Sequence, residues 1–566
     1  GVNSAEWLVA FLGCIAAGGL PVGVYPSDSA ETLEFKATDS QAVFIVVGTA
    51  EDAAIYQKFA GKLHSLKAMI VWNSNLPRDT VPGPFLDGPN RPRFLYWEEF
   101  VGQRRGEGTL LARIGAIKPG QAAAVVYTSG ATGPPKGVML SHDSLGWVAS
   151  VMQSNLLKTG KHRVFSHMPL SHATALMFDV VWPLYAAQAE GGPVVTYFAA
   201  GCFVEKRCVT EQLVDAKPTV MLGTPEVWDD LRVMMEMAIE SGMKEKGEEF
   251  NEVMLASNMG LNRLEAAISF DGAITRDTLR FFHQRGRKIL NLFAQSESAG
   301  LGLAWTPGDF GKVNLTGTLG SIGKPLGNDF QLSSSSAEIM LKGRNVMLGY
   351  LGRLGETQLK ITEDGWLKTG DLAELDWRSG HTFFAGRMSE MIENDKFQQI
   401  SPFGVEQGIK EACNAEAEIV KHVVVQGTGA PYLSALFTLF EKVTDGVPTG
   451  ELIGDSLSLS DATTVTEAQT SALWSYRLSR CVSAYNNANT TVDIDRVWRF
   501  AILPVGITPE SDPELMTPLQ KIKRKGVSEK YKDLIETCSR AVEPDKVGML
   551  LEPSPCAVPG ALFDVL

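Results

Sequence analysis

Residues 122–137 read AAAVVYTSGATGPPKG, an apolar run followed by a loop that is rich in glycine, serine and threonine. Three glycines in this loop allow the backbone to turn its amide groups inward. Thr128, Ser129 and Thr132 add hydroxyl donors, and the nearby Lys136 adds a positive charge. The stretch therefore predicts a strand that ends in a phosphate-binding loop.

This loop differs from the P-loop of NTPases, which has glycine directly before its lysine and serine or threonine directly after it. Here Pro135 precedes Lys136 and Gly137 follows it. Walker-type ATPase chemistry is therefore not expected. A turn of this composition can also be a plain surface loop.

The flanking sequence predicts a layered fold. Apolar runs at residues 42–47 and 67–72 enclose a helical pattern at residues 50–66. This alternation is typical of parallel sheets covered by helices. The expected fold class is α/β, with a large N-terminal domain of layered α/β subdomains.

The composition is that of a globular protein, with 44% hydrophobic and 21% charged residues in a chain of 566. Its net charge of −13 disfavours the binding of nucleic acid over most of the surface. An anionic substrate therefore needs cationic side chains at its binding site. The seven cysteines form no CxxC pair, which suits a reducing compartment.

Residues 7–25 carry no charge, a length that raises the question of a membrane span. Asn3 predicts a helix N-cap with Glu6 three positions on, and the Gly-Gly pair at 18–19 ends the helix. Such a helix is about 20 Å long, shorter than a bilayer core of about 30 Å. We therefore expect a helix and then a strand. Because the chain opens on Gly1 rather than Met, we also expect a missing upstream segment.

Further motifs follow the loop in order: FAQSES at 293–298, GWLKTGDL at 365–372, GRMSEMI at 386–392 and TPLQKIKR at 517–524. Together with YTSGATGPPKG they resemble the adenylate-forming enzymes, which include acyl-CoA synthetases, luciferases and the adenylation domains of peptide synthetases. Stretches such as GVNSAEWLVAFLGCIAAGG and PLSHATALMFDVVWP are most similar to the bubblegum-type long- and very-long-chain fatty acid ligases. The resemblance extends from the first residue to about Tyr531.

The resemblance implies an AMP-binding domain at residues 1–386, truncated at its start, and a small, mobile α+β lid domain at 387–540. A hinge is expected near Ser389. Residues 541–566 are expected to form a tail. The stretch 444–470 is rich in Gly, Ser, Thr and Asp and indicates an insertion or long loop in the second domain.

The resemblance also implies which residues bind ATP. The expected phosphate-binding residues are Thr128, Ser129, Gly130, Thr132, Gly133 and Lys136. Glu297 would be the Mg²⁺ ligand, Ser296 would donate to the α-phosphate and Phe293 would stack on adenine. Taken alone, a glutamate in a polar turn is usually just solvated, and a phenylalanine at a strand end is usually core.

Two further positions complete the implied site. Asp371 would accept both ribose hydroxyls, helped by Arg387, although an aspartate in such a turn often caps the local backbone. Lys521 would reach the substrate carboxylate and the α-phosphate. The expected catalytic residues are Lys521, Glu297, Thr132 and Lys136.

The implied function is a long-chain fatty acid–CoA ligase. ATP converts the fatty acid to an acyl-adenylate with release of pyrophosphate, and CoA then takes the acyl group and releases AMP. Mg²⁺, ATP and CoA are the expected requirements. The alternatives are an adenylating enzyme with another acceptor and a catalytically impaired acyl- or nucleotide-binding protein. Both alternatives gain weight from residues 396–398, because Lys-Phe-Gln stands where the bubblegum type has Gly-Gly-Glu.

Other features receive plainer interpretations. The basic run at residues 521–525 could bind nucleic acid, but its motif context and the negative net charge favour a protein that does not. His162, His167 and His172 lie five residues apart, a spacing that matches no zinc motif. Ser456 is expected to lie in a plain loop. The expected location is the cytoplasm, with peripheral attachment to the endoplasmic reticulum or other membranes as the alternative.

The acyl site is expected near His172, where the family lines its pocket, although a buried and satisfied histidine is the equal alternative. Phe178, Trp182 and residues 272–274 are expected to border the acyl chain.

Overall fold

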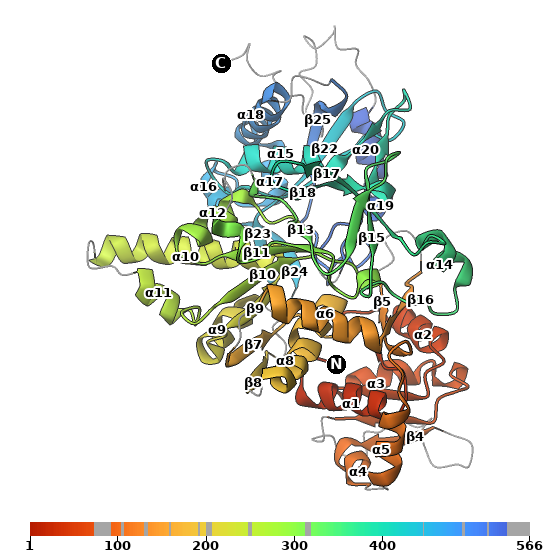
Figure 1. The fold of residues 1–566 in the computed structure, drawn as a ribbon. Coiled ribbons are helices and arrows are strands. Elements are labelled where there is room, and N and C mark those ends of the chain that lie inside the picture. The colour runs from red at the N-terminus through yellow and green to blue at the C-terminus, as the bar shows by residue number, and fades with distance from the viewer. Residues whose placement is uncertain are drawn as a thin grey trace. The chain divides into compact units, whose positions relative to one another are not determined.

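The structure is a computed structural model that describes residues 1–72, 92–103, 107–128, 134–157, 160–190, 193–199, 206–246, 252–311, 318–444, 446–488, 493–517 and 520–539. The chain forms two compact units (Figure 1). Unit 1 contains Gly1–Ser335, Ile339–Thr369 and Leu375–Phe383. Unit 2 contains Ser336–Glu338, Gly370–Glu374 and the chain from Phe384 onward. The expected domain boundary at residue 386 stays a prediction, and the expected tail lies outside the described residues.

Unit 1 is built around a seven-stranded sheet of order β13-β12-β11-β10-β9-β7-β8. Its strands are β7 (His162–Ser166), β8 (Val194–Phe198), β9 (Val220–Gly223), β10 (Ala266–Phe270), β11 (Ile289–Phe293), β12 (Leu303–Ala304) and β13 (Lys324–Pro325). The five strands from β8 to β11 run parallel, and β12 and β13 are antiparallel. Every residue of β9, β10 and β11 is buried, as expected for a parallel sheet that is covered on both faces.

Helices after these strands supply one large core. They are α9 (Lys206–Ala216), α10 (Pro225–Lys246), α11 (Glu252–Asn258) and α12 (Arg276–Gln284). Trp228 and Phe282 meet edge to face with ring centroids 5.8 Å apart, and Met221 and Ile289 of the sheet join the same cluster. The Trp228 indole donates to the Ile268 carbonyl at 3.1 Å, so its buried N–H is satisfied.

Two smaller sheets belong to unit 1. One has the order β1-β5-β6-β16, from β1 (Val22–Gly23), β5 (Ala122–Tyr127), β6 (Gly137–Ser141) and β16 (Gly349–Tyr350). The other is parallel, from β2 (Phe44–Val47), β3 (Ala68–Val71) and β4 (Arg93–Tyr96). The remaining helices are α1 (Ala5–Ala16), α2 (Ala30–Asp39), α3 (Ala50–Gln57), α4 (Trp97–Gly102), α5 (Glu107–Ala116), α6 (His142–Asn155), α7 (Ala173–Leu176), α8 (Trp182–Glu190) and α14 (Leu354–Lys360).

A fourth sheet has the order β14-β15-β17-β18. Its strands are β14 (Asp329–Leu332), β15 (Glu338–Lys342), β17 (Leu367–Asp376) and β18 (His381–Arg387). The chain passes from unit 1 to unit 2 and back within β17, and it passes to unit 2 again within β18.

The predicted α/β fold class is confirmed, and β2, α3 and β3 fall within the predicted runs at 42–72. The predicted cap of the first helix is wrong. Ser4 accepts from the Trp7 amide at 3.2 Å, whereas the Asn3 amide group donates to the Met168 carbonyl at 2.8 Å. Asn3 is therefore used to tie the chain to β7 rather than to start α1. No helix in the described ranges is both long and apolar enough to cross a bilayer.

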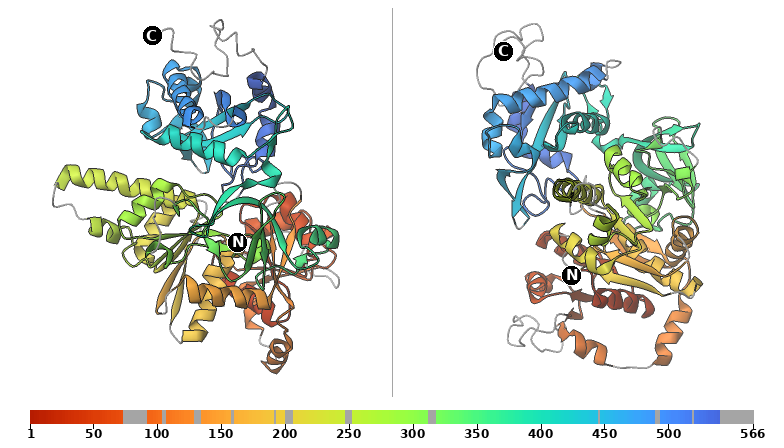
Figure 2. Two further views of the ribbon diagram at one scale, coloured as in Figure 1. Left: turned by 45° about the horizontal axis from the view of Figure 1, so that its top comes forward. Right: turned by 90° about the vertical axis from the view of Figure 1, so that its left-hand side faces the viewer.

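Unit 2 has a three-stranded sheet with both faces covered (Figure 2). The strands are β21 (Val420–Gln426), β22 (Leu433–Leu439) and β25 (Val497–Ile502). Alternate side chains face opposite ways, as strand geometry requires. Val425 and Phe437 join a core with α15 (Pro402–Asn414) and α18 (Ala472–Ala488). Val424 and Leu436 join another with α19 (Arg524–Lys530) and α20 (Lys532–Ser539).

The stretch 444–470 is not a long loop, and the alternative that it is an insertion stays a prediction. It contains β24 (Val447–Leu452), which pairs with β23 (Glu441–Thr444), and the short helices α16 (Asp455–Ser458) and α17 (Val465–Thr470). Leu452, Val465 and Ala468 are buried in the main core of unit 2, which explains why a polar sequence is ordered. Ser456 lies in α16 rather than in a loop, and its buried hydroxyl donates to the Ile419 carbonyl at 3.1 Å.

His167 gives unit 1 a testable pH dependence. Its ring is 3% exposed, and neither ring nitrogen has a hydrogen-bond partner within the described chain. Burial lowers the pKa of His167 to about 4, from 6.5. The unfolded chain therefore binds a proton between these values that the folded chain does not, so stability falls as the pH falls from about 6.5 towards 4.

We expect His167 to cost about 2.5 kcal/mol of stability at pH 4.5 relative to pH 7.5, at 1.36 kcal/mol per pKa unit. His167→Phe should remove this part of the pH dependence, because the phenyl ring keeps the contact with Phe165, whose ring centroid lies 5.2 Å away. Urea unfolding of wild type and His167→Phe at the two pH values measures this difference in the free energy of unfolding. His64→Gln, at an exposed position, should behave as wild type. An equal pH dependence in wild type and His167→Phe would refute this role.

Candidate functional site

The phosphate loop is held at its base by a strand pair. Tyr127 of β5 pairs with Gly137 of β6, and the Thr128 amide donates to the Lys136 carbonyl at 3.0 Å. A Cβ atom at Gly137 would lie 2.9 Å from Val125 Cγ1, so this position has no room for a larger residue. The predicted phosphate-binding residues Ser129, Gly130, Thr132 and Gly133 lie outside the described residues.

Lys136 and Glu297 both contact Tyr350. Strand β16 pairs with β6, which sets Tyr350 opposite Val138. The Lys136 ammonium lies 5.3 Å from the Tyr350 ring centroid, and the Tyr350 hydroxyl donates to Glu297 Oε1 at 2.7 Å. Burial and the negative charge of Glu297 raise the pKa of Tyr350, so the hydroxyl stays a donor at neutral pH. The two charged groups at the centre of the predicted site are therefore brought together.

Glu297 is positioned by a tight turn after β11. The turn is a 3-10 helix over Ser296–Ser298, in which the Gln295 amide donates to Ser298 Oγ at 3.1 Å. The Met347 amide donates to the Glu297 carbonyl at 2.9 Å, which fixes the turn to the segment before β16. Within the described chain, no protein group bonds the second carboxylate oxygen of Glu297.

This carboxylate fits Mg²⁺, which usually binds one or two protein carboxylates together with substrate phosphates. Within the described ranges, no cluster of three or more His, Cys, Asp or Glu side chains could hold a metal without such a ligand. Glu297 is thus suited to a metal that arrives with a nucleotide.

Lys136 also belongs to an ion-pair network. Its Nζ lies 2.6 Å from Glu356 Oε2. Arg353 lies 3.1 Å from the other Glu356 oxygen and 3.8 Å from Asp39, and Asp39 accepts from the Tyr127 hydroxyl at 2.7 Å. The hydrogen bonds from Lys136 and Arg353 lower the pKa of Glu356. The network therefore contains a carboxylate that is ionised at neutral pH directly beside the lysine.

Phe293 lies before the turn, and Ser296 is the first residue of the turn. Phe293 ends β11 and is 9% exposed, so little of its ring is accessible. Gln295 Nε2 donates to the Thr369 carbonyl at 3.0 Å, and Lys360 Nζ donates to the same oxygen at 2.9 Å. The roles predicted for Phe293 and Ser296 stay predictions.

The segment expected to border the acyl chain is largely core. Phe178 lies in a π-helix over Met177–Val181 and, like Trp182, is fully buried. The Trp182 indole donates to Gln153 Oε1 at 2.7 Å. The His172 ring caps α7, where its Nδ1 accepts from the Thr174 amide at 3.2 Å, and lies 5.2 Å from the Phe270 ring.

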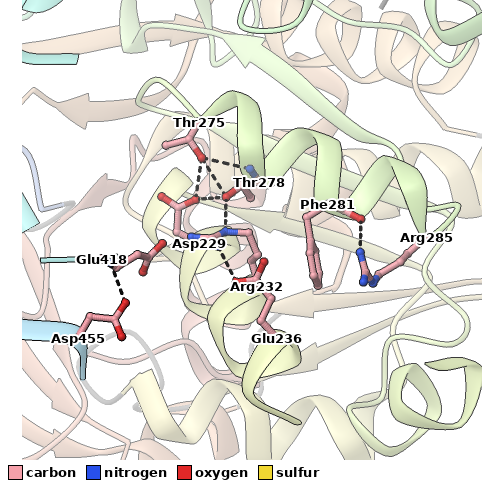
Figure 3. A network of polar contacts seen from close by, with 9 residues as sticks. All are labelled: Asp229, Arg232, Glu236, Thr275, Thr278, Phe281, Arg285, Glu418 and Asp455. Atoms are coloured by element: carbon pink, nitrogen blue, oxygen red, sulfur yellow. Dashed lines mark hydrogen bonds and ion pairs between the residues drawn. The ribbon is translucent and has the colours of Figure 1, made fainter. Parts of the chain in front are cut away.

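The loop at residues 272–274 is held by polar contacts between α10 and α12 (Figure 3). Thr275, the N-cap of α12, donates to Asp229 Oδ1 at 3.3 Å, and Thr278 donates to the same oxygen. The Arg232 guanidinium donates to Thr278 Oγ1 at 3.0 Å. The N-terminus of α12 and the loop before it are thus fixed to α10.

In unit 2, Asp371 and Arg387, which the resemblance assigns to the ribose, lie next to each other. Arg387 Nε donates to Asp371 Oδ1 at 2.8 Å, and Asp371 is 1% exposed. Lys521 lies in a narrow turn: its amide donates to Thr517 Oγ1 at 3.0 Å, and its carbonyl accepts from the Thr517 amide at 2.8 Å. The functional roles of these residues stay predictions.

Much of the basic run at 521–525 is used inside unit 2. Arg524 lies 2.7 Å from Glu406, which is partly buried, and Lys523 donates to the Pro513 carbonyl at 2.8 Å. Lys525 is 3.8 Å from Glu529 on the surface. The run is therefore in large part a structural element of this unit.

The Lys-Phe-Gln departure is the tip of a hairpin between β19 (Ile392–Glu393) and β20 (Gln399–Ile400). Asn394 Oδ1 accepts from the amides of Lys396 at 3.0 Å and Gln398 at 2.9 Å. Phe397 has a φ of 60°, where glycine is favoured, and is 81% exposed. At this position the chain therefore has a hairpin tip that is closed by hydrogen bonds to Asn394 and presents an aromatic ring to solvent.

The sequence motifs do not include Tyr350, Arg353 or Glu356. Tyr350 and Glu356 contact Lys136, Arg353 contacts Glu356, and these contacts depend on the pairing of β16 with β6. A two-residue strand has no periodicity to detect, so only a comparison with known structures could have revealed it.

Residues 1–351 match the family model of AMP-binding enzymes. The chain is 29% identical to "Long-chain-fatty-acid--CoA ligase ACSBG2" of Gallus gallus, over 95% of this chain and 73% of that protein. It is 28% identical to the Homo sapiens protein of the same name, over 95% and 83%. The predicted resemblance to bubblegum-type ligases is confirmed.

Solved structures share the fold. The anthranilate CoA ligase AuaEII in complex with anthranoyl-AMP superposes with a TM-score of 0.65 at 17% identity, over 94% of this chain and 87% of that one. O-succinylbenzoate coenzyme A synthetase (MenE) from Bacillus subtilis, in complex with ATP and magnesium ion, gives 0.61 at 18% identity, over 93% and 87%.

Proposed function

The chain belongs to the AMP-binding enzyme family, and from this we propose that it is a long-chain fatty acid–CoA ligase. In the proposed reaction the fatty acid carboxylate attacks the α-phosphate of ATP and pyrophosphate leaves. The thiol of CoA then attacks the acyl-adenylate, which gives acyl-CoA and AMP. The names of the relatives at 28–29% identity support the substrate class and the acceptor.

The observation that carries the proposal is the meeting of Lys136 and Glu297 on Tyr350, at distances of 5.3 Å and 2.7 Å. Both reactants of the first step are anions, so their mutual repulsion is the barrier that the protein must lower. A fixed ammonium group beside the phosphates does this by electrostatic stabilisation, without a protein nucleophile.

Glu297 would hold Mg²⁺, which supplies positive charge to the phosphate oxygens. Tyr350 keeps the carboxylate in place by donating to one of its oxygens, which leaves the second oxygen for the metal. We assign Asp371, with Arg387, to the ribose hydroxyls, because Arg387 fixes the orientation of the carboxylate. Lys521 is assigned to the first half-reaction, on the resemblance of its motif.

One assay tests the reaction. Release of pyrophosphate and AMP, formation of acyl-CoA and exchange of pyrophosphate into ATP are measured across fatty acids of increasing length, with and without CoA. CoA-dependent formation of acyl-CoA that is greatest for long chains supports the proposal. A preference for short or aromatic acids would refute the chain length, and absence of both products with every acid would refute the activity.

A second candidate is an adenylating enzyme that uses another acceptor. The exposed Phe397 at the tip of the hairpin favours it, because the resemblance places this segment along the path of CoA. In the same assay, exchange of pyrophosphate into ATP without acyl-CoA formation would support this candidate.

A further inference from the structure

The ammonium group of Lys136 already has a carboxylate partner. Nζ lies 2.6 Å from Glu356 Oε2, and the two side chains are 35% and 37% exposed. Glu356 lies on α14, which follows β16 directly along the chain. A phosphate group that approaches Lys136 must therefore compete with this carboxylate for the same positive charge.

Because Arg353 also binds Glu356, the exchange of Glu356 for a phosphate group at Lys136 costs little free energy. Arg353 lies 3.1 Å from Glu356 Oε1, so each oxygen of the carboxylate has a cation of its own. If Lys136 leaves, Glu356 keeps Arg353, and water can reach the freed oxygen because the pair is partly exposed. No buried charge is left without a partner, which is the condition that makes the breaking of an ion pair costly.

The local charges oppose the entry of a polyphosphate while the pair is intact. The network holds two cations, Lys136 and Arg353, against three carboxylates, those of Asp39, Glu297 and Glu356. Its formal charge is 2 − 3 = −1. Lys136 also lies next to the loop that the sequence predicts to bind phosphate. When Lys136 separates from Glu356, the charge beside this loop therefore changes.

We propose that Glu356 is a resident counterion of Lys136 that the phosphates of the nucleotide displace, so that this carboxylate sets the affinity of the site for polyphosphate. This inference rests on the proposed function, because it assumes that Lys136 meets phosphate. Glu356 then weakens the binding of the nucleotide in the ground state. Such a residue keeps the site from holding pyrophosphate after the first step.

The hydrogen bonds from Lys136 and Arg353 lower the pKa of Glu356. The carboxylate is therefore charged throughout the neutral range, and the competition does not depend on its protonation there. It should vary with salt, because ions screen exposed pairs.

The size of the effect follows from the exposure of the pair. Exposed ion pairs shift an equilibrium by up to about fivefold, and a ligand that needs the unpaired form loses affinity in proportion. Glu356→Gln removes the charge and keeps the shape. We therefore expect it to lower the dissociation constants of inorganic pyrophosphate and of MgATP by about two- to fivefold.

Titration calorimetry of the full chain tests this with inorganic pyrophosphate and MgATP as the probes. Glu363→Gln is the matched control, since it removes an exposed carboxylate just beyond α14 and should leave both constants unchanged. Thermal melting verifies that both variants fold. The increase in affinity of Glu356→Gln over wild type should become smaller when NaCl is raised from about 50 to 500 mM.

Three outcomes overturn the inference or its premise. Binding by Glu356→Gln that equals or is weaker than wild type means that the carboxylate positions Lys136 instead, and the inference is wrong. Equal tightening in Glu363→Gln means that only the net charge matters, and the inference again fails. A wild-type protein that binds neither probe overturns the proposed function itself.

Discussion

Replacing Lys136 with alanine should lower the rate of pyrophosphate release by about 10²–10³-fold, the usual cost of losing one group that stabilises developing charge. The ammonium group lies at the end of the phosphate loop, above the tyrosine that holds Glu297. The loss should be seen mainly in the maximal rate at saturating MgATP, because the resident carboxylate at Glu356 already limits what Lys136 contributes to ground-state binding.

The fold should survive this substitution, because Glu356 keeps its contact with Arg353 at 3.1 Å. Lys58→Ala, at an exposed position after α3, is the control for the loss of a surface lysine and should react as wild type. A Lys136→Ala enzyme that releases pyrophosphate within about threefold of the wild-type rate would be incompatible with the electrostatic role, which requires at least a hundredfold.

Replacing Lys521 with alanine should separate the two half-reactions. We expect formation of the acyl-adenylate to fall by about 10²-fold or more, because a charge beside the carboxylate and the α-phosphate is lost. Formation of the thioester from preformed acyl-adenylate and CoA should stay close to the wild-type rate. Single-turnover measurements of each step, with the same acid, give the two rates.

Lys525→Ala is the matched control for this substitution. It removes a lysine of the same basic run whose contact in the structure is with Glu529 at the surface, at 3.8 Å. It should leave both steps unchanged. If Lys521→Ala slowed both steps to the same degree, the assignment of this residue to the first half-reaction would be wrong.

The strand that leads into the phosphate loop could be predicted from the sequence because its pattern is local. The apolar run before Tyr127 and the turn residues after it suffice for a strand and a loop, and β5 ends at that residue. The same is true of β2 and β3, which fall in two predicted apolar runs.

The surroundings of Lys136 could not be predicted, because they are made by contacts between distant segments. Tyr350 and Glu356 reach the lysine only through the pairing of β16 with β6. Asn3 failed as a cap for a related reason, since its amide bonds to Met168 in a distant segment. Tertiary hydrogen bonds decided between two positions that the local pattern could not separate.

The prediction of a long loop at residues 444–470 was wrong for a different reason. Its polar composition is typical of loops, yet a few apolar residues such as Leu452 and Val465 are enough to anchor a hairpin and a helix to the core of unit 2. Composition averages over the stretch and so conceals residues that are spaced to reach one core.

The most direct test of the central claim is the binding of ATP with and without Mg²⁺, measured by titration calorimetry on the wild-type chain and on Glu297→Gln. We expect wild type to bind ATP much more tightly when Mg²⁺ is present, and Glu297→Gln to lose most of that gain while it still binds ATP alone. ATP binding that is absent in wild type, or a gain from Mg²⁺ that Glu297→Gln retains in full, would contradict the claim that Lys136, Tyr350 and Glu297 form a site for a metal-bound polyphosphate.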